Sequence, residues 1–115
     1  MRLSSLISNK EYIQHILDEI EFLLIQSKDL KADRFSDDEV LQRAFVRSLE
    51  IIGEATKKIS PELKLEYPGI EWKLIAGTRD KLIHDYIGVD YDIIWDIIQN
   101  KIPVLKREMD KIQLA

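Results

Sequence analysis

The chain has 115 residues, 45% of them hydrophobic and 33% charged, which suits one compact domain over residues 1–115 and excludes a disordered chain. It contains no cysteine, which excludes zinc ribbons, iron–sulfur clusters, thiol nucleophiles and disulfide scaffolds. The 17 basic and 21 acidic residues give a formal net charge of −4, which argues against a protein that coats nucleic acid by bulk attraction.

The first half of the chain predicts two long amphipathic helices. Ser8-Asn9-Lys10-Glu11 has the form of a capping box, and the apolar spacing that follows predicts a helix over residues 9–28. A second capping box, Ser36-Asp37-Asp38-Glu39, opens another periodic stretch that continues to Ile59.

The second half predicts shorter helices and one long one. Ser60 and Pro61 favour the start of a short helix over 61–67. Residues 70–76 and 79–86 predict two short helical pieces or one bent helix, because Gly77-Thr78 interrupts the pattern. Asp90 is suited to cap a last long helix, in which Pro103 should cause a bend.

The whole pattern predicts an all-α protein. No segment alternates apolar and polar residues over the length of a strand, and the connections between the long helices are short. We expect an antiparallel four-helix bundle with one or two extra short helices. No apolar run approaches the roughly 20 residues that cross a bilayer, so we expect a cytoplasmic protein without a membrane partner.

The segment from Gly77 to Tyr86 gathers Arg, Lys, Asp, His and Tyr side chains. One interpretation is an ordinary solvated helix face. The other is a site for phosphodiester chemistry, in which His84 exchanges protons with a ribose hydroxyl or the leaving oxygen and Arg79 stabilises charge on phosphorus. That route needs neither a metal nor a cofactor.

Arg79 and His84 are five residues apart, so on a continuous α-helix they would point about 140° away from each other. One chain is therefore a poor site. A two-fold dimer would bring two copies of each residue around one cleft, so this mechanism predicts a homodimer.

Other residues leave alternatives open. Asp80 and His84 share a helix face and Asp85 is adjacent, which permits a metal site. We expect His15 to be a surface residue and Trp72 and Trp95 to pack in the core, although Trp95 could reach a dimer partner.

A series of lysines leads into this segment: Lys57, Lys58, Lys64 and Lys73. They could guide an RNA strand toward His84, but interspersed glutamates weaken the case.

The pattern Arg79-x4-His84-x-Tyr86 resembles the motif of the HepT-like toxins, a branch of the all-α HEPN superfamily. The likeness covers nearly the whole chain. It includes the second-helix segment 49–55, Trp72 with the run Ile75-Ala76-Gly77, the pair Val89-Asp90 with Trp95, and the later segment 103–105.

The resemblance implies a dimeric, metal-independent endoribonuclease toxin that acts on RNA such as tRNA or mRNA. Arg79 and His84 would form the composite catalytic site, and Asp80 would orient His84. It also implies a minimal nucleotidyltransferase antitoxin as partner, which transfers AMP from ATP to Tyr86. The modification would inactivate the toxin, because AMP adds bulk and negative charge where the RNA phosphate should sit.

Two rival functions remain. The chain could be a non-catalytic dimeric helical module that docks a nucleotidyltransferase or a nucleotide, or a purely structural helical dimer.

Overall fold

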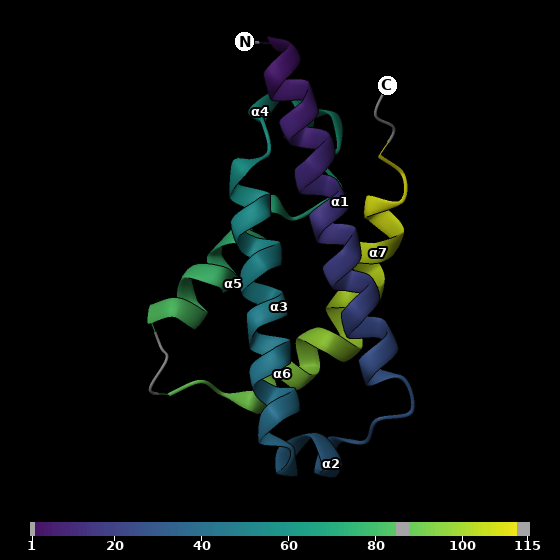
Figure 1. The fold of residues 1–115 in the computed structure, drawn as a ribbon, viewed down its shortest axis with the longest axis vertical. Helices are drawn as coiled ribbons and strands as arrows, with labels where there is room; N and C mark the ends of the chain where they lie inside the picture. Colours follow the sequence, from purple (N-terminus) through teal and green to yellow (C-terminus); the bar gives the residue numbers. More distant parts are fainter. Residues whose placement is uncertain (1, 85–87, 113–115) are drawn as a thin grey trace.

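The computed structural model describes residues 2–84 and 88–112, apart from the side chains of residues 2–8, 79–80 and 82–84. All regular structure in these ranges is helical (Figure 1). In chain order the elements are α1 (Arg2–Ser27), α2 (Ala32–Asp37), α3 (Glu39–Lys58), α4 (Pro61–Glu66), α5 (Trp72–His84), α6 (Tyr91–Asp96), the π-helical turn η1 (Ile97–Lys101) and α7 (Ile102–Met109).

The long elements form an antiparallel bundle, as Figure 1 shows. Helix α3 packs against both α1 and α5, and α7 with the turn η1 packs against α1. The short helices α2 and α4 lie at opposite ends of the bundle (Figure 1). The prediction of an all-α antiparallel four-helix bundle with extra short helices is therefore confirmed. No helix among the described residues is long and apolar enough to cross a membrane.

The core forms where the apolar stripes of the helices meet. On α1, Ile13, Ile16, Ile20 and Leu23 follow helical spacing and are at most 4% exposed. At the end of the bundle near α2, the ring of Phe35 stacks on the ring of Phe45, with 5.3 Å between ring centroids. Burial of these faces holds α1, α2 and α3 together, because apolar area is removed from water.

Helix α1 begins earlier than the sequence pattern predicted. It starts at Arg2, so the proposed capping box at Ser8 to Glu11 lies inside the helix and that prediction was wrong. Asn9 is buried and bonds to Ser60 at the start of α4. Its Nδ2 donates to Ser60 Oγ at 2.8 Å, and its Oδ1 accepts from the Ser60 backbone N–H at 3.0 Å. A tertiary contact therefore uses the side chain that the pattern assigned to a local cap.

We expect Asn9→Ala to lower the free energy of unfolding by about 1–3 kcal/mol, because the Ser60 groups would lose both partners in a partly buried setting. Urea denaturation followed by circular dichroism measures the change. The matched control is Lys10→Ala, at the exposed neighbouring position, where we expect a change within about 0.5 kcal/mol. Equal midpoints for the wild type and Asn9→Ala would contradict the assigned role.

The second capping box was also misplaced. Ser36 belongs to α2, and Asp38 caps α3, its Oδ1 accepting from the Leu41 backbone N–H at 3.0 Å. The local pattern did not reveal α2, a helix of six residues that is anchored by the buried ring of Phe35. Gln42 holds the junction, because its Nε2 donates to the backbone oxygens of Phe35 and Ser36, each at 2.9 Å.

Two predicted caps are confirmed. Ser60 Oγ accepts from the Leu63 backbone N–H at 3.3 Å, and Pro61 occupies the first turn of α4. Asp90 caps α6 by accepting from the backbone N–H groups of Asp92 and Ile93.

Helix α5 is one continuous helix through Gly77 and Thr78, so the alternative of two separate pieces was wrong. The hydroxyl of Thr78 donates to the Leu74 carbonyl one turn earlier, at 2.9 Å, and does not start a new helix. A glycine inside a helix costs only about 1 kcal/mol relative to alanine, which this helix tolerates. The expected end at Tyr86 lies outside the described residues.

The last helical segment changes direction between α6 and α7 (Figure 1), and Pro103 lies in the first turn of α7, so the predicted bend is confirmed. Proline lacks the backbone N–H, and its ring clashes with the carbonyl one turn earlier in a regular α-helix. In the turn η1, directly before α7, the helix takes the wider π-helical form, in which the Ile102 backbone N–H donates to the carbonyl of Ile97 five residues earlier.

Candidate active site on helix α5

Helix α5 carries three of the four predicted site residues, namely Arg79, Asp80 and His84. Their positions are described along the helix, whereas their side chains lie outside the described atoms. Tyr86 lies outside the described residues altogether. The C-terminal end of α5 lies at the edge of the molecule in Figure 1, away from α1.

The continuous register of α5 separates the two predicted catalytic positions. Position 79 falls about 140° around the helix from position 84. It lies on the side that carries buried Trp72 and half-buried Ile75, whereas position 84 falls on the opposite side. The register of a single chain therefore does not bring the two positions together, although it places position 80 on the same face as position 84.

The face that includes position 84 borders a hollow between α5 and α6, which we call the α5–α6 hollow. Its volume is about 590 Å³. Helix α5 lines it with Lys73, Leu74, Gly77, Thr78 and Lys81, and the chain around the start of α6 lines it with Gly88, Val89, Asp90, Ile93, Ile94 and Ile97. Lys81 places this hollow beside the motif segment.

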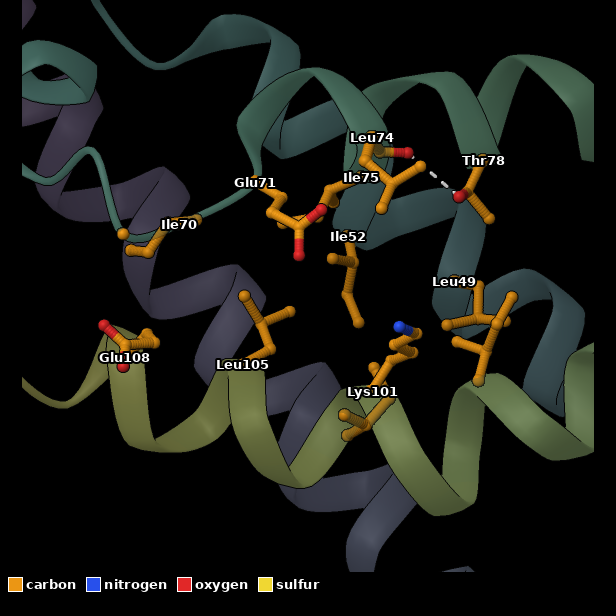
Figure 2. Close-up of a pocket in the computed structure, with 13 residues that line it drawn as sticks. Leu49, Ile52, Ile70, Glu71, Leu74, Ile75, Thr78, Lys101, Leu105 and Glu108 are labelled. Atoms are coloured by element: carbon orange, nitrogen blue, oxygen red, sulfur yellow. Dashed lines mark hydrogen bonds between the residues drawn. The ribbon is translucent and has the colours of Figure 1, made fainter.

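A second depression, the α5–α7 groove, has a volume of about 250 Å³ and is mostly apolar. Leu49 and Ile52 of α3 lie between its two walls, and Figure 2 shows Leu74 and Ile75 of α5 across from Leu105 of α7. Leu74 borders both depressions and is 54% exposed. The helix that carries the motif therefore also presents apolar surface to solvent.

Three charged side chains line the mostly apolar α5–α7 groove (Figure 2). Lys101, from the π-helical turn, lies between Ile52 and Leu49, whereas Glu108 lies near Ile70 on the far side of Leu105, and Glu71 lies on the opposite wall. Lys101 forms no salt bridge with a described residue, and Glu108 pairs with Lys111 at 3.0 Å. The groove thus combines mostly apolar walls with side chains of opposite charge.

The lysines of the predicted RNA path have different surroundings. Lys58 pairs with Glu54, 3.9 Å away, and its ammonium lies 5.9 Å from the centre of the Tyr12 ring. Lys64 is half-buried on α4. Lys73 is exposed on α5 and forms no salt bridge with a described residue. Of these three, Lys73 is the one that borders the hollow beside the motif.

The remaining residues singled out in the sequence fall mostly as expected. His15 is exposed on α1, and Trp72 is buried with its Nε1 donating to the Tyr67 carbonyl at 3.0 Å. The ring of Trp95 stacks on Phe35 with 5.3 Å between centroids, so it packs within its own chain.

Sequence reasoning missed the shared face of Lys73, Gly77 and Lys81. Their four-residue spacing was the available signal, but it became meaningful only once α5 proved to be continuous.

For the metal alternative, no group of three His, Asp or Glu residues within the described part of the chain could hold a metal ion. The alternative itself concerned Asp80, His84 and Asp85, whose side chains lie outside that part.

An antiparallel helical bundle with an Arg-x4-His motif on its third long helix defines the class of HEPN-like domains. Within that class the chain belongs to the HepT-like family, because residues 11–112 match the family described as "Ribonuclease HepT-like".

Several curated proteins are similar to the chain. "Putative RNase TTE0752" of Caldanaerobacter subterraneus subsp. tengcongensis is 50% identical over 103 residues, which cover 90% of this chain and 92% of that protein. "Probable ribonuclease HepT" of Thermococcus cleftensis is 39% identical over 106 residues, covering 92% and 96%. "Gamma-glutamylcyclotransferase and putative RNase MJ0434" of Methanocaldococcus jannaschii is 43% identical over 103 residues, which make up 46% of that longer protein. No solved structure matches the chain.

Proposed function

We propose that this chain is a single-domain HepT-type toxin that cleaves RNA without a metal ion. The observation that carries the proposal is the Arg-x4-His-x-Tyr motif on α5, beside an open hollow, in a chain that matches the HepT-like ribonucleases over residues 11–112. The names of the similar proteins support the same reaction class.

Three residues of α5 have roles in the proposed reaction. His84 takes the proton from the ribose 2′-hydroxyl, whose oxygen bonds to the adjacent phosphorus while the bond from phosphorus to the 5′-oxygen breaks. The imidazolium so formed then donates its proton to the leaving 5′-oxygen, which leaves a 2′,3′-cyclic phosphate. Arg79 stabilises the negative charge that develops on the phosphate oxygens. Asp80, one turn before His84, orients the imidazole. These steps use ordinary acid–base chemistry, so no cofactor or metal enters the proposal.

The two catalytic groups come together in a homodimer. We infer this from the continuous register of α5, which sets positions 79 and 84 about 140° apart in one subunit. In a two-fold dimer, Arg79 of one subunit can lie in the same cleft as His84 of the other.

The α5–α7 groove is the proposed contact surface of the dimer. A two-fold interface must be complementary to itself. Rotation about an axis through the groove would place Lys101 of one copy against Glu71 and Glu108 of the other. The exposed side chain of Leu74 would then be covered at the same contact. Because α5 forms one wall of this groove, the contact would also bring the two motif helices close together.

A minimal nucleotidyltransferase is the proposed antitoxin. It transfers AMP from ATP to the Tyr86 hydroxyl and releases pyrophosphate. The added phosphate and nucleoside place negative charge and bulk two residues from His84, where the phosphate of an RNA substrate would bind. Cytoplasmic RNA, such as tRNA or mRNA, is the proposed substrate.

The reaction is tested by incubating the purified protein with labelled RNA in excess chelator. We expect cleavage by the wild type and a rate about 10² to 10⁴ times lower for His84→Ala, since that change removes a general acid–base group. The matched control is His15→Ala, which removes the exposed histidine of α1 and should cleave normally.

Loss of cleavage in chelator with recovery on adding Mg²⁺ would contradict the metal-independent route. Cleavage that persists unchanged in His84→Ala would remove this residue from the mechanism. A wild type that binds the nucleotidyltransferase but cleaves none of the RNAs offered would favour the rival function, a non-catalytic helical module that docks that enzyme.

A further inference from the structure

We propose that Lys73, Gly77 and Lys81 form an RNA-backbone track along α5 that leads single-stranded RNA to His84. This inference rests on the proposed ribonuclease function and adds the residues that hold the substrate. All three residues line the α5–α6 hollow.

The three residues form one stripe because they are spaced four apart on a continuous helix. Positions 73, 77, 80, 81 and 84 all fall within about 100° of one another around the helix axis. The stripe therefore runs directly toward the position of His84. Eight residues of α-helix separate the two lysines by about 12 Å along the axis, so each lysine can contact a different phosphate of one strand.

The charges on this face suit a polyanion. Lys73 and Lys81 are both exposed, and neither forms a salt bridge with a described residue. Asp90 also lines the hollow, but its carboxylate accepts from the backbone N–H groups at the start of α6, at 2.9 and 3.4 Å. On α5 itself the acidic residue of this face is Asp80, and the proposed mechanism assigns it to His84. Two lysines are thus available for phosphate, even though the chain as a whole is acidic.

Gly77 opens the middle of the stripe. It is exposed, and a Cβ added there would meet no atom within 4 Å, so no neighbouring side chain fills the space in front of it. The backbone is therefore bare between the two lysines, which allows close approach of a sugar–phosphate chain. The other wall of the hollow presents the apolar side chains of Val89 and Ile93, which can contact the faces of bases.

The test measures binding of a labelled single-stranded RNA oligonucleotide by fluorescence anisotropy over a range of salt concentrations. The non-cleaving His84→Ala protein serves as the background for all variants. The plot of log K against log salt has a negative slope. We expect Lys73→Ala and Lys81→Ala each to make this slope less steep by about 0.7, with a similar effect for different RNA sequences. The double variant should have a slope that is less steep by about 1.4.

The matched control is the double change Lys28→Ala and Lys31→Ala. It removes the same charge from two exposed lysines near the loop between α1 and α2, and the slope should remain that of the background protein. Gly77→Gln tests the open backbone separately. We expect it to raise the melting temperature, because glycine is a poor helix former, while weakening RNA binding severalfold with an unchanged salt slope.

The outcomes separate this inference from the proposed function. RNA cleavage by the wild type, combined with unchanged binding by the Lys73 and Lys81 variants, would overturn the track alone. Failure of the wild type to bind or cleave any RNA would overturn the proposed function as well. Light scattering that shows monomers for Gly77→Gln or the lysine variants would identify the stripe as a subunit contact and overturn the track.

Discussion

Mixing two inactive variants, Arg79→Ala and His84→Ala, is expected to restore RNA cleavage to about one quarter of the wild-type rate. Random exchange makes half of the dimers mixed, and each mixed dimer retains one intact arginine and one intact histidine on different subunits. If each catalytic pair is formed across the dimer, one of two pairs is then complete. The experiment mixes the proteins under conditions that allow subunit exchange, and measures cleavage of labelled RNA in chelator.

Native mass spectrometry of the same mixture provides the control by counting the mixed dimers. A second control combines the doubly substituted protein with either single variant, where no complete pair can form and no activity should return. If mixed dimers are abundant and yet inactive, Arg79 and His84 must act within one subunit. That result would require the backbone of α5 to leave regular helical geometry after Thr78, because a continuous helix keeps positions 79 and 84 on different sides.

Modification of Tyr86 is expected to abolish RNA cleavage. The protein is incubated with the cognate nucleotidyltransferase and ATP, and intact-mass analysis should show the gain of one AMP per chain as cleavage activity disappears. The physical reason is the charge and bulk that AMP adds two residues from His84, which would repel and displace the RNA phosphate.

Tyr86→Phe should gain no AMP and should keep its RNA cleavage in the presence of the enzyme and ATP. The matched control is Tyr91→Phe, which changes the next tyrosine in the chain and should be modified and silenced like the wild type. AMP on Tyr86→Phe would remove this tyrosine from the proposal. AMP on the wild type without loss of cleavage would separate the modification from inactivation.

The local sequence predicted those features that depend on neighbouring residues alone. The caps at Ser60 and Asp90 and the change of direction before Pro103 are of this kind, because a side chain bonds to backbone groups within its own turn or proline removes one donor. The start of α1 and the existence of α2 were not predicted. Asn9 bonds to Ser60 across the bundle and Phe35 is buried against Phe45, and such distant partners leave no trace in a local pattern.

For the candidate site, the sequence by itself determined the residue types and their spacing, and with them the family and the reaction class to test. Helical periodicity and a five-residue separation follow directly from the order of the residues. Only the tertiary structure decided that α5 runs unbroken through Gly77, that α3 covers one of its sides, and that Lys73 and Lys81 border an open hollow on the other. The reason is that exposure and charge pairing depend on which helices pack together, and packing joins residues far apart in the chain.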